Sequence, residues 1–204
     1  MDAVALLVIT AFVLIVNRGV HMSWLFVDDL YLWNDFNENP GFLGYVFPKH
    51  ANYFRPVYWL MAWSVLKIAG TNLQMVIYVN LLILIITSFI LYSFLRSLLR
   101  GVGGGYVLSL LLSVAFSICR FSFYQVSQLV GLVESVALLF VLLMMISLYG
   151  YMKEGCTLKF FAGLLCYILA VLTHERYMVL LPMLFYAVIF EGEGSVFGFL
   201  NAKG

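Results

Sequence analysis

The sequence has 204 residues, of which 64% are hydrophobic and 10% are charged, and its mean hydropathy is +1.03. Soluble domains carry about a quarter charged residues, so this composition predicts an all-α integral membrane protein. The net charge of +1 excludes the strongly basic surface that binding to nucleic acid requires.

The apolar intervals predict about six transmembrane helices, because a helix needs about 20 mostly apolar residues to cross a bilayer. They cover residues 3–24, 73–95, 106–119, 129–151, 158–173 and 177–190. Arg18 and His21 fall in the last turns of the first interval, where an arginine can extend to the interface. We expect residues 1–204 to form one transmembrane module. We also expect this module to be a fragment of a longer protein with further spans.

Residues 56–69 form an apolar interval that is too short to cross a membrane. Pro56 suits the first turn of a helix, Gly70 suits its stop, and Thr71 or Asn72 can cap the span that follows. The interval also holds aromatic residues of the kind found at headgroup depth, namely Tyr58, Trp59 and Trp63. This pattern predicts a helix lying on the membrane surface.

Residues 24–57 are the only long polar interval in the chain and are expected to form the first extracytoplasmic loop. Four of the ten acidic residues lie in it, namely Asp28, Asp29, Asp35 and Glu38. Six spans place this loop on the same side as the 120–128 turn and His174–Arg176. The opposite side carries the cations Arg96, Arg100, Lys153, Lys159 and Lys203. The positive-inside rule makes that opposite side cytoplasmic, although the loop side carries as many cations.

Asp28 and Asp29 follow the first span directly and are the candidate catalytic residues. A partly desolvated carboxylate has a raised pKa and can act as a general base. Adjacent helical residues point about 100° apart, so the two acids need not share a role. The alternative is that they are solvated loop acids or helix caps.

Arg55 stands beside Pro56 at the start of the surface helix, where a guanidinium can hold a phosphate with two hydrogen bonds. The alternative is an arginine that anchors to lipid headgroups. Glu134 lies within an apolar run and is expected to form an ion pair, with Arg120 as its partner. The sequence His174-Glu175-Arg176 predicts a charge relay or a phosphate contact, or else a plain turn between two helices.

Four segments resemble the N-terminal half of GT-C membrane glycosyltransferases, in particular the protein O-mannosyltransferase-like group. They read WLFVDDLYLWNDF, NYFRPVYWL, GTNLQMVIYVNLL and THERYMVLLP. Asp28 and Asp29 match that group's acidic pair, and residues 53–57 match its arginine–proline motif with one inserted phenylalanine. Further matches are Gly70, Asn72 and Asn80 for the turn and asparagine, and Leu181 and Pro182 for the later apolar stretch. His174 and Glu175 stand where the group has a Lys-Glu pair.

The resemblance implies an inverting transfer of a sugar from a polyprenyl-phosphate donor to a hydroxyl of a protein, glycan or lipid acceptor. Asp28 would be the base and Asp29 would position it or bind a cation, or the two roles would be reversed. Arg55 and Arg176 would hold the donor phosphate, supported by His174, Glu175 and Glu134. Members of the superfamily differ in needing a divalent metal such as Mg²⁺ or Mn²⁺, and the sequence leaves this open.

The expected location is a multi-pass position in a bacterial inner membrane or an ER-like membrane, with the acidic loop outside the cytoplasm. Two other functions remain compatible with the sequence. One is a non-catalytic membrane scaffold or assembly subunit, and the other is a component that transports a lipid-linked sugar. Transport predicts polar or broken helices at mid-membrane, whereas the polar residues here gather at one face.

Overall fold

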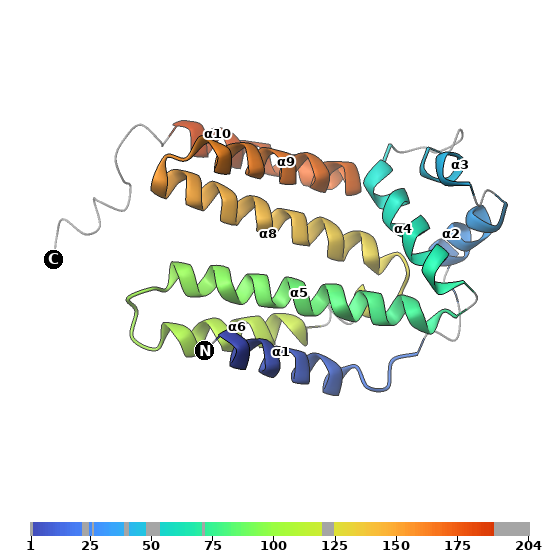
Figure 1. Ribbon diagram of the computed structural model, residues 1–204, viewed down its shortest axis with the longest axis horizontal. Coiled ribbons are helices and arrows are strands. Elements are labelled where there is room, and N and C mark those ends of the chain that lie inside the picture. The colour runs from blue at the N-terminus through green and yellow to red at the C-terminus, as the bar shows by residue number, and fades with distance from the viewer. Residues whose placement is uncertain are drawn as a thin grey trace.

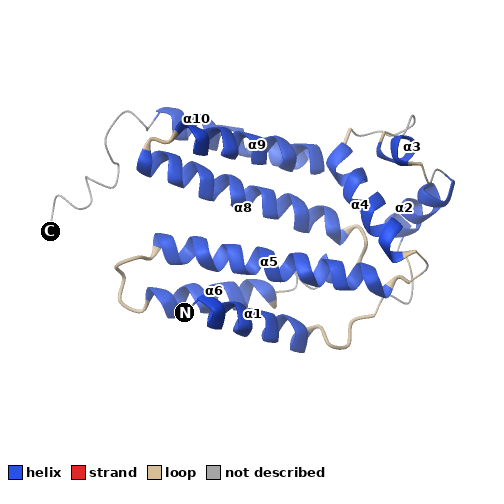
Figure 2. Ribbon diagram, viewed as in Figure 1, coloured by secondary structure: helices blue, strands red, loops and turns tan. Residues whose placement is uncertain are grey.

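A computed structural model of the chain describes residues 2–21, 25, 27–38, 41–47, 54–70, 72–119 and 125–189. Over these residues the fold is helical and contains no strand, as Figure 2 shows, so the all-α prediction is confirmed. Several residues named above lie outside the described part of the chain, namely Tyr53, Thr71, Arg120 and Lys203.

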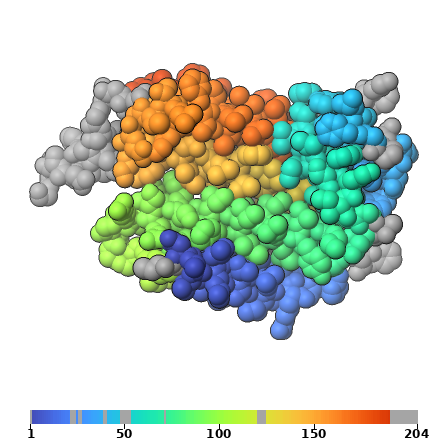
Figure 3. Space-filling view, in the orientation of Figure 1, coloured from blue at the N-terminus to red at the C-terminus, as the bar shows by residue number. Residues whose placement is uncertain are grey.

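Most helices run lengthwise and form one bundle (Figure 1). They are α1 (Asp2–Val16), α5 (Gln74–Leu98), α6 (Gly105–Ser117), α8 (Gly131–Glu154), α9 (Thr157–Thr173) and α10 (Leu181–Ile189). A 3-10 helix, η1 (Glu175–Leu180), joins the last two. Three other helices lie across one end of the bundle and cover it (Figure 3), namely α2 (Val27–Glu38), α3 (Phe42–Val46) and α4 (Pro56–Ala69).

The bundle therefore has two distinct ends. We call the end covered by α2–α4 the site end; α5 and α8 begin there and α9 finishes there (Figure 1). At the opposite end, α1 begins, α5 ends and α8 turns into α9. The polar segments that the sequence assigned to one side do meet at the site end, since Arg55 contacts Glu175 and Asp29 contacts Val130.

Two helices, α5 with 25 residues and α8 with 24, are long and apolar enough to cross a membrane. The other predicted spans are helical but shorter: α1 has 15 residues, α6 has 13 and α9 has 17. At 1.5 Å per residue, α1 extends about 22 Å, less than the roughly 30 Å of a hydrocarbon core. The interval 177–190 divides between η1 and α10.

The first helix is shorter than the interval 3–24 predicts, because α1 ends at Val16. The Asn17 side chain donates to the Val13 carbonyl at 2.9 Å, and the Val20 N–H returns to the Asn17 carbonyl at 3.0 Å. This turn places Arg18 and His21 beyond the helix rather than in its last turns. The described part of the polar interval 24–57 is also more ordered than a loop, since it contains α2 and α3.

The prediction for residues 56–69 is confirmed as a helix, with Pro56 in its first turn and Gly70 after its last. Gly70 has a φ of 54°, which favours glycine, and the Asn72 side chain, one residue before the N-cap Leu73, accepts from the Gln74 N–H at 3.1 Å. The aromatic residues differ from the expectation. Tyr58 and Trp59 are buried. Tyr45 of α3 packs edge-on against Trp59, with 5.5 Å between the centres of the two rings.

Small and apolar residues at every fourth position let the lengthwise helices approach one another. On α1 they are Ala5, Ile9 and Val13, and on α6 they are Ser109, Ser113 and Ser117, all buried. Each of these serine hydroxyls donates to a carbonyl of its own helix at 2.7–2.8 Å, so burial leaves none of them without a bond. Small residues of this kind allow close packing of membrane helices.

Candidate functional site

Asp28 and Asp29 begin α2 but face different surroundings. Asp28 is exposed, whereas Asp29 is fully buried at 0% exposure. The Asp29 Oδ1 accepts a hydrogen bond of 2.8 Å from the Val130 N–H, directly before α8. The carboxylate thus lies at the N-terminus of α8, where the helix dipole favours negative charge. The structure separates the two acids into one that is accessible to a reactant and one that joins α2 to α8.

Arg55 precedes α4 and forms a two-pronged ion pair with Glu175, which lies 120 residues further along the chain. Its Nε donates to Glu175 Oε2 at 2.5 Å, and its Nη2 donates to Glu175 Oε1. These hydrogen bonds lower the pKa of Glu175 to about 2. Glu175 is therefore ionised throughout the physiological range, and it holds the start of α4 against the end of α9.

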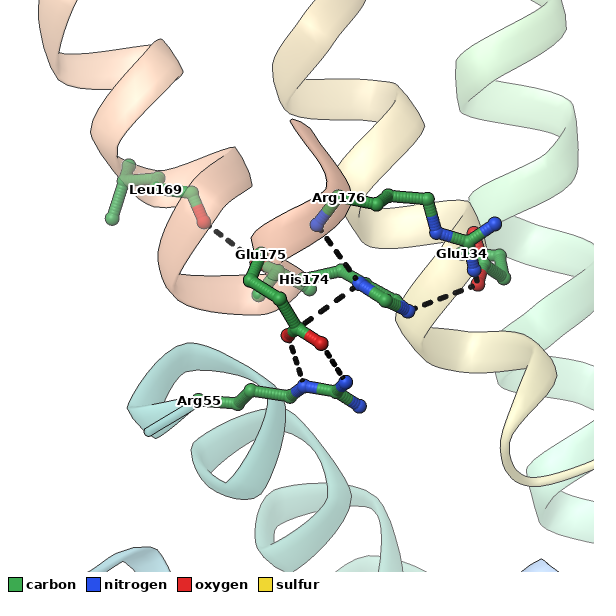
Figure 4. Close-up of polar contacts among 7 residues, drawn as sticks. Arg55, Glu134, Leu169, His174, Glu175 and Arg176 are labelled. Carbon is green, nitrogen blue, oxygen red and sulfur yellow. Dashed lines mark hydrogen bonds and ion pairs between the residues drawn. The ribbon is translucent and has the colours of Figure 1, made fainter. Parts of the chain in front are cut away.

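Glu134 lies in the first turn of α8, is 8% exposed, and forms an ion pair with Arg176. The expected partner, Arg120, lies outside the described residues. The Nε2 of His174 is 3.8 Å from Glu134 Oε1, and its Nδ1 is 3.6 Å from Glu175 Oε2. Figure 4 shows that His174 lies between the two carboxylates. The structure thus brings Glu134, His174, Glu175 and Arg176 together with Arg55, and Glu134 pairs with Arg176.

His174 is held mainly as a neutral ring. Its Nδ1 accepts a hydrogen bond of 3.3 Å from the Arg176 N–H, which places the proton of the neutral ring on Nε2, facing Glu134. Burial and the nearby Arg55 charge lower the pKa of His174, and Glu175 partly offsets them. We call the five residues Arg55, Glu175, His174, Glu134 and Arg176 the ion-pair network. With His174 neutral, the two arginines of the network balance the charges of its two glutamates.

Tyr58 is buried in the first turn of α4, three residues after Arg55. Burial raises the pKa of its hydroxyl, and the charges of Arg55, Asp29 and Asp28 all act on it. The sequence predicted Tyr58 as a membrane-surface aromatic, and its burial close to these charges was missed. The signal was present in its place three residues after Arg55, one turn into the same helix.

Asn80, which the motif comparison singled out, has a structural task at the site end. Its amide donates to the Val126 carbonyl at 3.3 Å and to the Gln128 carbonyl at 2.8 Å. The segment that leads into α8, and hence the backbone N–H that Asp29 binds, is fixed to α5 in this way. Asn80 therefore supports the site without contacting a reactant.

Metal ligands do not gather in the described part of the chain. No group of three or more histidine, cysteine, aspartate or glutamate side chains lies close enough together there to hold a metal ion. A metal bound at Asp28 would therefore need ligands from a substrate or from residues outside the described part of the chain.

Comparison with known proteins yields no relative: no family model, curated protein or solved structure matches this chain. The resemblance to GT-C enzymes consequently depends on the short sequence motifs quoted above alone.

Proposed function

We propose that this chain is a multi-pass integral membrane protein whose site end faces away from the cytoplasm. Two helices of membrane-spanning length support this, and so do the large apolar side chains on the outer faces of the bundle. Among those at least 55% exposed are Leu7, Tyr78, Leu82, Val107, Leu111, Phe161 and Leu165. An apolar surface of this extent is stable in contact with lipid rather than with water.

We propose that it acts in the transfer of a sugar from a polyprenyl-phosphate donor to an acceptor hydroxyl. The observation that carries the proposal is the placement of an accessible acid, Asp28, at the same end of an apolar bundle as two arginines, Arg55 and Arg176. A polyprenyl-phosphate donor presents one phosphate at the membrane surface, with its sugar outside the bilayer and its tail inside.

In the proposed reaction, Asp28 accepts the proton of the acceptor hydroxyl. At the same time the hydroxyl oxygen bonds to the anomeric carbon of the sugar. The bond between that carbon and the phosphate oxygen breaks on the opposite side, so the configuration inverts. Arginine stabilises the negative charge that develops on the departing lipid phosphate. Asp29 keeps α2 in place through Val130, which makes it a positioning residue.

The present partner of Arg55 indicates how a phosphate would bind. A carboxylate and a phosphate both offer two oxygens to the guanidinium fork. Glu175 occupies that fork in the structure, so a donor phosphate would share or replace its hydrogen bonds. Because the pKa of Glu175 is about 2, protonation at neutral pH does not release it, and the phosphate must compete with an ionised carboxylate.

The test is a transfer assay in membranes that contain the full chain, with radiolabelled polyprenyl-phosphate mannose as donor and the endogenous acceptors. Asp28→Asn should reduce transfer by about 10²-fold or more, as expected for loss of a general base. Glu38→Gln changes another exposed acid of α2 and should leave transfer unchanged. Equal transfer by Asp28→Asn and the unmodified protein would refute the assignment. Parallel samples with EDTA test the metal requirement.

A non-catalytic scaffold is the second candidate, and one observation favours it. Arg55 and Arg176 are both already paired with carboxylates of the same chain, which is the expected arrangement when ion pairs serve to hold helices together. A scaffold predicts that Asp28→Asn is silent, whereas variants of the ion-pair network weaken assembly.

The orientation of the site end can be measured directly. Asn37 is exposed on α2, so a cysteine placed there in a background without Cys119, Cys156 and Cys166 reports the side of the membrane. We expect a membrane-impermeant maleimide to label it in intact cells. Labelling only after lysis would place the site end in the cytoplasm, and the proposed use of an external lipid-linked donor would be wrong.

A further inference from the structure

A second charged site lies at the opposite end of the bundle, far from the ion-pair network. A pocket of about 560 Å³ opens there between the start of α1, the last turn of α5 and the turn that leads into α6. Its polar lining consists of Asp2, Ser93, Arg96, Ser97, Arg100 and Tyr106. Nothing in the proposed sugar transfer uses these residues, so the pocket needs an explanation of its own.

Arg96 is held in place in this pocket by three neighbours. It forms an ion pair with Asp2, and its guanidinium carbon lies 6.0 Å from the centre of the Tyr106 ring. Asp2 in turn accepts a hydrogen bond of 3.4 Å from the hydroxyl of Tyr92, whose side chain is fully buried. The guanidinium is thus oriented before any ligand arrives, which lowers the entropic cost of binding.

Arg100 lies two residues beyond the end of α5, in the turn that leads to α6, and lines the same pocket as Arg96. It is exposed, and the structure records no ion pair or hydrogen bond for its side chain within the described residues. Asp2 is the one acid that lines the pocket, against two arginines, so the lining carries a net charge of +1. The pocket is therefore suited to an anion, with Arg100 available to donate to it.

The backbone beside the arginines adds to this preference. The turn contains Gly101 at a φ of 95° and Gly104 at a φ of 78°, and α6 starts after it without a side-chain cap. The first N–H groups of a helix without a cap carry partial positive charge and lack partners inside the helix. The uncapped start of α6 thus adds partial positive charge beside the two arginines that line the pocket.

The level of the pocket relative to the bilayer indicates which kind of anion it binds. The 25 residues of α5 extend about 37 Å, a few ångströms more than the roughly 30 Å hydrocarbon core. A helix of this length that begins at the site end brings Arg96 in its last turn, and Arg100 just beyond the helix, to the level of the headgroups on the other face. Arginine binds phosphate with two parallel hydrogen bonds, and the phosphates of lipids lie at this depth.

We propose that this pocket binds a phosphate group, supplied by an anionic phospholipid of the leaflet opposite to the site end. Arg100 and Arg96 hold the phosphate oxygens, and the exposed apolar residues nearby, Leu98 and Val102, contact the acyl chains. The bound lipid would fix the end of α5 against α1 and α6. The proposal does not depend on sugar transfer at the site end.

The test counts lipids bound to the purified full chain by native mass spectrometry from detergent, with dioctanoyl phosphatidate as the probe. Arg100→Gln should weaken binding by at least about tenfold, as expected for loss of a charged hydrogen-bonding partner. Lys153→Gln, which removes an exposed cation from the same end but outside the pocket, should change binding less than twofold. Arg100 is exposed and its side chain has no recorded ion pair to lose, so this variant is expected to fold.

Two further samples identify the source of the phosphate. Dioctanoyl phosphatidylcholine should bind more weakly than phosphatidate, because its choline partly cancels the phosphate charge. Ammonium phosphate that displaces phosphatidate at equal concentration would retain the phosphate site but assign it to a soluble anion. Equal binding of phosphatidate to the unmodified protein and to Arg100→Gln would overturn the proposal, as would equal losses in Arg100→Gln and Lys153→Gln.

Discussion

The same substitution, aspartate to asparagine, should affect stability at one of the two adjacent acids of α2 and activity at the other. Asp29 is fully buried and receives the Val130 N–H at 2.8 Å, whereas Asp28 is exposed. Asparagine keeps an acceptor oxygen at either position but removes the negative charge. The substitution should therefore destabilise the fold at Asp29 and reduce sugar transfer at Asp28.

The magnitude follows from the surroundings of Asp29. A hydrogen bond to a charged group contributes about 1.5–3 kcal/mol, and a partly buried charge at a helix N-terminus contributes up to about 2 kcal/mol. Since asparagine retains part of the first contribution, Asp29→Asn should cost about 2 kcal/mol. In a chain of this length that lowers the Tm by about 4–8 °C. Asp28→Asn should cost about 0.5 kcal/mol, or roughly 1–2 °C.

Thermal unfolding in detergent can be followed with a maleimide that fluoresces on reaction with thiols. Cys119 and Cys166 are half-buried and become fully reactive as the bundle opens, and replacing the exposed Cys156 by serine removes the most accessible thiol of the folded protein. The reasoning would be refuted if Asp29→Asn melted within about 1 °C of the unmodified protein. A drop of equal size in Asp28→Asn would refute it too.

Three more predictions concern the ion-pair network and the turn before α6. Arg55→Gln and Glu175→Gln should show a coupling energy of about 0.5–1 kcal/mol in a double-mutant cycle, since their side chains are 21% and 40% exposed; additive effects would exclude a working pair. The pKa of His174 is lowered from 6.5, so below pH 6.5 the unfolded chain binds the proton first and stability falls. His174→Asn should therefore flatten the decrease in Tm between pH 7.5 and 5.5, and an unchanged slope would contradict the pKa shift. Gly105→Ala should lower stability by about 1–3 kcal/mol, because its Cβ would lie 2.5 Å from the Leu99 carbonyl oxygen. Gly103→Ala has no atom within 4 Å and is the control for the same Tm measurement.

Local signals in the sequence predicted the helices well where stops and caps are explicit. Pro56 and Gly70 bound α4 at the predicted residues, and the long apolar runs became α5 and α8. The alternation of helices also placed His174–Arg176 on the same side as the polar interval that contains Arg55, and the structure adds the contact between Arg55 and Glu175. These features depend on local backbone preferences and on the alternating direction of successive helices, both of which can be inferred from a single sequence.

The remaining features depend on long-range contacts, which composition does not record. Asp28 and Asp29 have the same chemistry and adjacent positions, and only the approach of Val130 distinguishes them. The end of α1 at Val16 was missed because Arg18 was assigned to the last turns of the span, whereas the Asn17 side chain turns back to Val13 and the helix stops there. The helix α2 was foreseeable, since residues 27–38 contain no glycine or proline and two acids occupy its first turn.

The ion pair between Arg55 and Glu175 also sets the order in which the molecule can be completed during synthesis. Ribosomes add about 5–20 residues per second, so roughly 6–24 s separate the translation of these two residues, which are 120 positions apart. Asp29 likewise waits for a backbone N–H that lies 101 positions later. Helices α1, α5 and α6 are made before either contact exists. A nascent chain that stalls before α9 is finished therefore has most of its apolar helices and an α2 that carries its acids, but no closed site.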